Sequence, residues 1–483
     1  MIAWTIYLTF GGAVLALLLP RALSRWIALV TTGAGLLINL AAFSRGDVAT
    51  YQTIVRIPWI PSLGMEYHLA LDGISLTLTL VTAITAISAV LFSWDVEQRP
   101  NEFFFWLLLV VGGSYGVFLS ADLFLFFVFY ELVIVPKYFL ISIWGSTNKE
   151  YGAMKLTLYS FLGGTLVFVG VIAAYIVGGT FNLQELARVS FPPHLQAWAF
   201  PVLFLGFAIL AGVWPLHTWA PTGHVAAPTA GSMLLAGIVM KLGAYGALRV
   251  AMNTFPQGLV TWRNWIAVLA VIGIVYAAGV ALRQRDLKFV IGYSSVSHMG
   301  FVLLGLATLN SLGVSGAVLQ MFSHGVIGAL LFAIAGRMIY PRTHTRDLDE
   351  LSTMHLSRAL PFAATVFVIA SAASMGIPGF SGFAAEITIL IGAWKAYPVA
   401  VWLTGVGMVL VAAFTLRALV KSFFSEPASE TIRGEHEPFT PITMPEKIGA
   451  ALLIFSTLAI GLYPKLLLDR ISPAVEALRF IQK

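Results

Sequence analysis

The sequence contains no cysteine, and only 10% of its 483 residues are charged. Without cysteine, the chain cannot supply thiolate ligands to an iron–sulfur cluster or a zinc ion. An average soluble domain carries about 25% charged residues, whereas 59% of this chain is hydrophobic and its mean hydropathy is +0.88. A soluble protein of this size could not bury so much apolar surface. The chain is therefore predicted to lie in a lipid bilayer, and the composition excludes a nucleic-acid-binding protein.

Apolar stretches long enough to cross the hydrocarbon core, about 20 residues each, recur along the whole chain. They predict an all-α polytopic membrane protein with about 14 transmembrane helices. The expected spans are residues 2–20, 26–44, 69–93, 103–120, 122–145, 151–178, 197–220, 228–254, 264–282, 288–309, 313–340, 360–393, 398–424 and 446–464.

Helix-breaking residues interrupt two of these stretches. The seventh runs into Pro215, Pro221 and Pro228, and the twelfth contains GIPGFSGF around Pro378. Proline removes a backbone donor and glycine loosens a helix, and in lipid the freed carbonyls must be satisfied by protein or water. Broken helices at corresponding positions of two halves are typical of inverted-repeat transporters, although prolines also produce ordinary kinks.

Seven ionisable side chains lie within the apolar stretches, where a charge costs several kcal/mol. They are Glu131, Lys137, Lys155, Lys241, His298, His324 and Glu386. Burial disfavours the charged form of each group and a nearby opposite charge restores it. At an effective dielectric of 20, two charges 4 Å apart interact by about 4 kcal/mol, so moving one partner decides whether the other holds its proton. We therefore predict that these seven residues form a proton pathway with water.

Several of these residues also have a structural interpretation. Lys155 could extend its amine to the membrane surface, and His298 and His324 could bridge helices by hydrogen bonds. His217 and His224, beside the prolines of the seventh stretch, could satisfy freed carbonyls and are weak evidence for a metal. Because the sequence shows no phosphate loop and no metal-binding motif, we expect neither a cofactor nor a metal in this chain.

Lysine and arginine are concentrated in alternate loops, for example at residues 283–288 and 337–346. Loops rich in these residues face the cytoplasm. With an even number of spans, both termini are then expected on the outer side of a bacterial inner membrane. The polar segment 426–446 is expected to be a solvated cytoplasmic loop.

Five segments carry a resemblance to one family. They are YELVIVPKYFLISIWG, PLHTWAPTGHVAAPTAGSMLLAGIVMKLGAYGALR, DLKFVIGYSSVSHMGFVLLG, SHGVIGALLFAIAGRMIY and GIPGFSGFAAEITIL. Together they are similar to the antiporter-like membrane subunits of respiratory complex I, and the acid in the last segment resembles subunit M, the chain-4 type. The resemblance implies a proton-translocating subunit without a redox centre of its own, which works with other membrane subunits and couples to quinone reduction elsewhere in the complex.

The resemblance also implies roles and an internal organisation. Glu131 would respond to the neighbouring subunit, and Lys241 would be the central relay. His298 and His324 would link it onward, and Glu386 would carry the proton on the exit side. The single membrane domain would consist of N-terminal helices (1–100), a first repeat (101–254), a second repeat (255–425) and a loop with a C-terminal helix (426–483).

The sequence departs from the family pattern near the seventh span. The family normally has a lysine where this chain has Leu210, and it shows PDAH where this chain has PTGH, with Thr222 and Gly223. Conversely, Lys137 stands where the family usually has an apolar residue. We hypothesise that Lys137 replaces the missing amine beside Glu131. The six residues between them correspond to about 9 Å along a helix axis and to different faces, so a kink at Pro136 or a bridging water is required.

Other functions fit the same residues. The chain could belong to a Mrp-type sodium/proton antiporter or to a membrane-bound hydrogenase complex, although those relatives usually carry a lysine near the position of Glu386. It could also be a structural subunit that does not pump, in which Lys137 extends to the surface or contacts another subunit. Leu210 is the residue that favours this last alternative.

Overall fold

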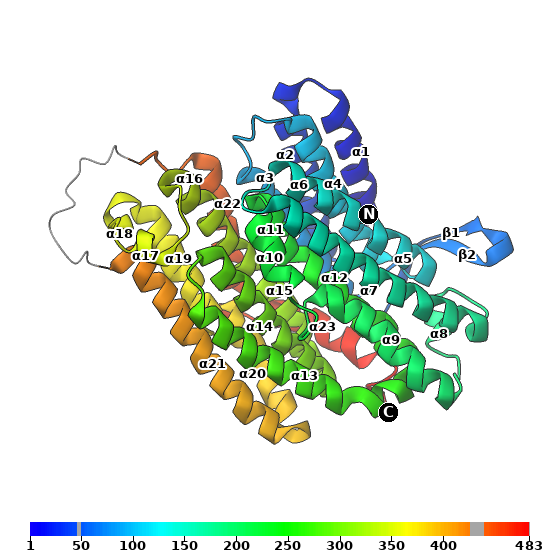
Figure 1. The fold of residues 1–483 in the computed structure, drawn as a ribbon. Helices are drawn as coiled ribbons and strands as arrows, with labels where there is room; N and C mark the ends of the chain where they lie inside the picture. Colours follow the sequence, from blue (N-terminus) through cyan, green and yellow to red (C-terminus); the bar gives the residue numbers. More distant parts are fainter. Residues whose placement is uncertain (46–49, 426–438, 483) are drawn as a thin grey trace.

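The computed structural model describes residues 1–45, 50–425 and 439–482, and they form a bundle of helices with one small β-hairpin (Figure 1). In this part of the chain, twelve helices are long and apolar enough to cross a membrane. Two shorter apolar helices, α1 (Trp4–Leu18) and α19 (Pro361–Ser374), complete the set of expected spans. The predicted all-α polytopic membrane fold is confirmed, and every predicted span overlaps a helix.

The helices follow the predicted order along the chain. The first are α1, α2 (Arg21–Ser44) and α3 (Gly73–Leu91). Next come α4 (Pro100–Leu119), α5 (Leu123–Leu132), α6 (Ile134–Trp144), α7 (Lys149–Gly178), α8 (Leu183–Leu186), α9 (Pro193–Ala211), α10 (Trp219–Ala226), α11 (Thr229–Leu234) and α12 (Met240–Gly246). They are followed by α13 (Pro256–Arg283), α14 (Leu287–Ala307), α15 (Ser311–Ala333), α16 (Tyr340–Thr343), α17 (Leu348–Leu351), α18 (Leu356–Ala359), α19, α20 (Ser381–Ala396) and α21 (Pro398–Leu419). The last helices are α22 (Met444–Leu462) and α23 (Lys465–Glu476).

Four π-helical segments lie within or at the ends of the spans. They are η2 (Leu235–Val239), η3 (Ala247–Met252), η4 (Ile334–Ile339) and η5 (Val420–Phe424). A π-turn widens the helix locally and is frequent at functional sites. Two of them, η2 and η3, lie on either side of α12, which carries Lys241.

The hairpin of β1 (Gln52–Ile60) and β2 (Met65–Leu71) was not predicted. The two antiparallel strands are joined by the short turn η1 (Pro61–Leu63) and by Gly64, whose φ of +68° suits glycine. The last residues of β2 are apolar, which is why the third span was expected to begin at residue 69. In the structure the helix begins after Asp72, whose carboxylate accepts a hydrogen bond from the Ser75 backbone N–H at 2.9 Å.

The bundle has two distinct ends (Figure 1). The β-hairpin, α8 and the residues after α23 lie at one end, called here the hairpin end, where the Arg479 side chain donates to the Val189 carbonyl. The helices α16, α17 and α18 lie at the opposite end, called here the α17 end, where Arg346 pairs with Asp286 at 3.2 Å. The predicted loop 426–446 falls largely outside the described residues.

The centre of the bundle contains the helices that carry the candidate residues. The spans formed by α3, by residues Thr229–Met252 and by residues Ser311–Thr343 are almost completely buried, whereas α2 and α21 expose most of their surface at the periphery. Ionisable groups on the central spans therefore face other helices rather than lipid.

Both predicted helix breaks are present. In the seventh span, α9 ends at Ala211, Gly212 adopts a φ of +75°, and the next helix, α10, begins only at Trp219. In the twelfth span, α19 and α20 are separated by a stretch in which Gly376 and Gly379 adopt φ values of +71° and +102°.

The fifth span has a local joint between α5 and α6, with Val133 at the end of one helix and the start of the other. The joint lies in the turn before Pro136, as expected for a proline kink, because proline has no N–H to donate to the Leu132 carbonyl. It lies between Glu131 and Lys137, where the hypothesis requires a kink.

The contact between α7 and α9 depends on two facing glycines, and this predicts a stability effect. A Cβ placed on Gly206 would lie 2.7 Å from the carbonyl oxygen of Gly163, a backbone atom that cannot move freely. We expect Gly206→Ala to lower the free energy of unfolding by about 1–3 kcal/mol, the usual cost of overpacking, in a denaturant titration in detergent. Gly405→Ala on α21 is the control, because nothing lies within 4 Å of its Cβ. Equal stability of the two variants would contradict the close packing.

Candidate functional site

Lys241 lies at the centre of the bundle on α12 and is completely buried. Its side chain leans toward the start of the helix, as helical side chains do, and the ammonium donates to the Ala236 carbonyl within η2. The same nitrogen lies 2.8 Å from Nδ1 of His324 on α15. The π-turn and the histidine therefore hold a buried amine that has no carboxylate in contact with it among the described residues.

A pair of stacked imidazoles continues from this amine. The rings of His324 and His298 have centroids 5.5 Å apart and planes inclined by 11°. Nδ1 of His298 lies 2.8 Å from the Ser294 carbonyl, and Nε2 lies 3.1 Å from the Ser374 carbonyl at the end of α19. Because carbonyls only accept, the ring satisfies both contacts when each nitrogen carries a proton.

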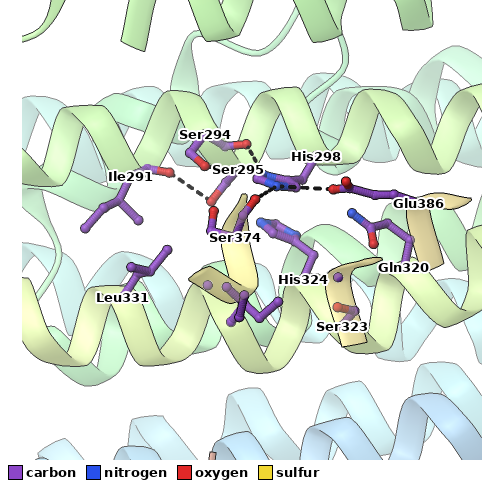
Figure 2. Close-up of a pocket in the computed structure, with 14 residues that line it drawn as sticks. Ile291, Ser294, Ser295, His298, Gln320, Ser323, His324, Leu331, Ser374 and Glu386 are labelled. Carbon is purple, nitrogen blue, oxygen red and sulfur yellow. Dashed lines mark hydrogen bonds and ion pairs between the residues drawn. The ribbon is translucent and has the colours of Figure 1, made fainter. Parts of the chain in front are cut away.

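The series ends at a buried carboxyl group. Oε1 of Glu386 lies 3.6 Å from Nε2 of His298, and both side chains are about 5% exposed. The break in the twelfth span makes room for it, since a Cβ on Gly376 would come within 2.8 Å of Glu386 Oε2. Figure 2 shows Glu386, His298 and His324 around one small cavity, with Gln320 beside the carboxyl. Lys241, His324, His298 and Glu386, four of the seven predicted residues, thus form a continuous series of neighbours.

Glu131 lies apart from this series. It is half-buried near the end of α5, and its carboxyl group packs so closely on Gly164 of α7 that a Cβ there would overlap it. Its buried oxygen Oε1 has no hydrogen-bond partner among the described residues. The structure therefore places an acid at the joint of the fifth span without bringing it into contact with Lys241.

Lys137 is 3% exposed, so it does not extend to the surface. Its ammonium has no hydrogen-bond partner among the described residues, and it interacts electrostatically with Glu131. It lines a small cavity together with Leu234, Leu235 and Val239. The amine therefore lies between Glu131 and the π-turn that holds Lys241.

The structure places Lys155 neither in the series from Lys241 to Glu386 nor beside Glu131 and Lys137. It is partly exposed on α7, where its ammonium lies 3.3 Å from the Thr222 hydroxyl and 5.7 Å from the centre of the Tyr151 ring. This position fits the structural interpretation of Lys155 as well as a pathway role.

Two further buried groups, Lys288 and His224, had no place in the predicted pathway. Lys288 was counted with a basic loop, yet it is 3% exposed and its ammonium donates to the Ala227 carbonyl at 2.9 Å. His224 on α10 is fully buried, and its ring stacks on Phe332 at 4.3 Å. Neither of its nitrogens has a hydrogen-bond partner among the described residues, so it does not satisfy freed carbonyls. In the sequence, His224 stands beside the prolines of the seventh span, and Lys288 stands at the start of the tenth span. No other sequence feature marked these two residues.

These two groups connect the α17 end with the centre. Lys288 lines a cavity of about 220 Å³ together with Arg337 and Tyr340. His224 interacts electrostatically with both Lys288 and Lys241. His224 therefore lies within electrostatic range of both the lysine at this cavity and the central amine.

The chain matches a family of known membrane proteins. A family model described as "NADH:quinone oxidoreductase/Mrp antiporter, TM" matches residues 120–412, more than half of the chain. The chain belongs to this family. Its match includes every candidate residue identified above.

Individual members of the oxidoreductase/antiporter family match over most of their length. "NAD(P)H-quinone oxidoreductase chain 4 2" of Synechococcus sp. (strain JA-3-3Ab) is 37% identical over 466 residues, which cover 94% of this chain and 86% of that protein. "NADH-quinone oxidoreductase subunit M" of Rhodobacter capsulatus is 36% identical over 468 residues, which cover 94% and 90%. In the solved structure of respiratory complex I from Thermus thermophilus with bound NADH, one chain matches with a TM-score of 0.90 and 28% identity over the full length of both chains.

Leu210 stands in the seventh span where the resemblance led us to expect a lysine. Its side chain is 2% exposed and packs in the core near Gly243, where a Cβ would meet the Leu210 backbone. The buried amine nearest to Glu131 in the sequence is Lys137.

Proposed function

We propose that this chain is the proton-translocating antiporter-like subunit, of the subunit M type, in a complex I-type quinone oxidoreductase. The observation that carries the proposal is the unbroken series of contacts from Lys241 through His324 and His298 to Glu386 inside the bundle. Ionisable groups buried in a membrane mark ion pathways, and an amine, two imidazoles and a carboxyl group in series suit proton transfer.

The chain takes no part in electron transfer in this proposal. Quinone reduction takes place in other subunits, and this subunit contributes the proton step without a cofactor of its own. Its partners are the other membrane subunits of the complex, including neighbouring antiporter-like subunits. The N-terminal helices (1–100), the two repeats (101–254 and 255–425) and the C-terminal part (426–483) are its proposed units.

Each group in the series has a chemical task. The Lys241 ammonium gives a proton to Nδ1 of His324, and the ring releases one from Nε2, with water in the cavity completing the connection to His298. His298, which donates at both nitrogens when doubly protonated, passes a proton to the Glu386 carboxylate. Lys241 becomes neutral when it gives up its proton, and Glu386 becomes neutral when it accepts one. One proton therefore advances along the series without net movement of a side chain.

Protons enter in this scheme from the α17 end. Lys288 and His224 connect the cavity at that end to Lys241. Because the basic loops lie there, the α17 end faces the cytoplasm of a bacterial cell and both termini face outside.

Glu131 and Lys137 form the acid–base pair of the first repeat in this proposal. Their electrostatic interaction, the burial of Lys137 and the joint at Val133 support the replacement of the missing seventh-span amine. The half-buried position of Glu131 leaves it accessible to a neighbouring subunit.

The central test is Glu386→Gln in the assembled complex, reconstituted in proteoliposomes. Quinone-dependent acidification of the vesicles should slow about 10²-fold, because the amide cannot accept and release the proton, while assembly of the complex persists. Thr388→Val on the same helix is the matched control and should pump normally. Normal pumping by Glu386→Gln would refute the series, and sodium-dependent rather than proton-dependent transport by the wild type would favour the antiporter alternative.

The Lys137 pairing predicts a rescue. Lys137→Leu should abolish coupled proton uptake in vesicles, since Glu131 then has no basic partner. Adding Leu210→Lys, which returns the amine to the seventh span, should restore uptake in the double variant. Lys395→Leu, which removes an exposed lysine, is the control. Unchanged pumping by Lys137→Leu would favour the structural alternative for this part of the chain.

The contact between Gly164 and Glu131 predicts a second rescue. Gly164→Ala should displace the Glu131 carboxyl and reduce coupled uptake, because the added methyl overlaps the carboxyl oxygens. Glu131→Asp in the same chain shortens the acid by one methylene and should recover part of the activity. If Gly164→Ala pumps normally, the packed position of Glu131 has no bearing on transport.

A further inference from the structure

A column of side chains runs from Lys241 toward the hairpin end. Tyr245 and Arg249 follow Lys241 at intervals of four residues, and residues so spaced lie on one face of a helix. The guanidinium of Arg249 lies 5.5 Å from the centre of the Tyr245 ring, which confirms that the two neighbours face the same side. The column therefore connects the central amine with the end of the bundle opposite to the entry cavity.

Arg249 is buried and paired. It is 4% exposed, its guanidinium pairs with the Asp72 carboxylate, and it lies 4.4 Å from the centre of the Tyr51 ring. Asp72 in turn accepts the hydrogen bond that caps α3 from Ser75. The ion pair is thus fixed between the eighth span, the third span and the segment that precedes β1.

Beyond the ion pair lies a large polar cavity. Its volume is about 440 Å³, and its walls include Arg249, Asp72, Arg188 and Arg479 at the hairpin end. Among the described residues that line this cavity, Asp72 is the one that carries a carboxylate. A hydrated cavity therefore reaches the ion pair from the side that the proposed function assigns to the outside.

On the other side of the ion pair the column is aromatic, and the Tyr245 hydroxyl is its polar group. The Tyr245 ring packs against Phe118 at 5.3 Å and against Phe126 at 6.3 Å, and its hydroxyl donates to the Phe118 carbonyl. The Lys241 ammonium leans away, toward Ala236. Lys241 and the cavity are therefore separated by one aromatic layer and one ion pair.

The chemistry of the pair makes it a poor proton relay. A guanidinium does not release a proton in a protein, and its fixed positive charge repels an approaching proton, as arginine does in water-selective pores. Asp72 could carry protons, but it is an acceptor already engaged by Arg249 and by the backbone. Neither charged group of the pair is therefore placed to pass a proton from the cavity toward Lys241.

We propose that Arg249, with Asp72, is a proton seal that prevents protons from flowing back from the outside to Lys241. This inference rests on the proposed function, because a seal matters only if Lys241 exchanges protons with the other side. It assigns a role in coupling to a residue outside the transfer series.

The test measures passive proton leak, without electron donor, in proteoliposomes that contain the assembled complex and carry an imposed pH difference. Arg249→His replaces the seal with a group that takes up and releases protons and can still pair with Asp72, so folding is preserved. The leak should rise about tenfold over wild type, which removes about 1.4 kcal/mol from the barrier. Arg188→His is the matched control in the wall of the same cavity and should remain as tight as wild type.

Two double variants identify the route. Arg249→Gln removes the cation and leaves Asp72 free to carry protons, so it should also leak. Because an unpaired buried acid can destabilise a fold, it is compared with Arg249→Gln/Asp72→Asn, which has no charge at this site and should be tight again. Arg249→His/Lys241→Met should also be tight, because the leak passes through Lys241.

The outcomes separate this inference from the proposed function. A wild-type complex that pumps, together with a tight Arg249→His complex of normal quinone reductase activity, would overturn the seal and leave the function intact. A leak that persists in Arg249→His/Lys241→Met would overturn it as well, because the seal would then guard another route. A wild-type complex that does not pump would instead refute the proposed function.

Discussion

The contact between the Lys241 ammonium and Nδ1 of His324 is the interaction on which the rest of the structure depends. A buried amine without a carboxylate in contact is costly in an apolar interior. The fold supports it with the Ala236 carbonyl, exposed by a π-turn, and with an imidazole that accepts its hydrogen bond. The surrounding spans are the most deeply buried of the bundle, which keeps this polar centre away from lipid.

The helix breaks serve the same centre. The interruption of the twelfth span ends α19 at Ser374, whose free carbonyl receives His298, and it places Gly376 where a side chain would collide with Glu386. The interruption of the seventh span places His224 and the Ala227 carbonyl next to Lys288. Backbone groups that a continuous helix would have used internally thus become partners of the ionisable side chains.

The sequence predicted the features that depend on composition and on short-range pattern. The spans, the two glycine- and proline-marked breaks and the burial of Lys241, His298, His324 and Glu386 follow from hydropathy and from the cost of charge in lipid. The joint at Val133 also follows from the sequence, because Pro136 cannot donate to the Leu132 carbonyl.

Features that depend on tertiary contacts could not be predicted from the sequence. Lys288 follows two exposed arginines, and only the fold shows that its ammonium turns inward to Ala227. The hairpin was missed because the apolar end of β2 continues into α3 without a change in hydropathy. The roles of all seven candidate residues remain predictions.

The joint at Val133 has a consequence for how this chain can couple to its neighbours. Where an acid and its base sit on two different helices, any sliding of one helix along the other alters their separation. Here Glu131 and Lys137 belong to one short stretch of backbone, so they travel together and their spacing is governed by the torsion angles of a few residues. The separation of the two groups therefore changes when their own segment bends. It does not change when the surrounding helices slide.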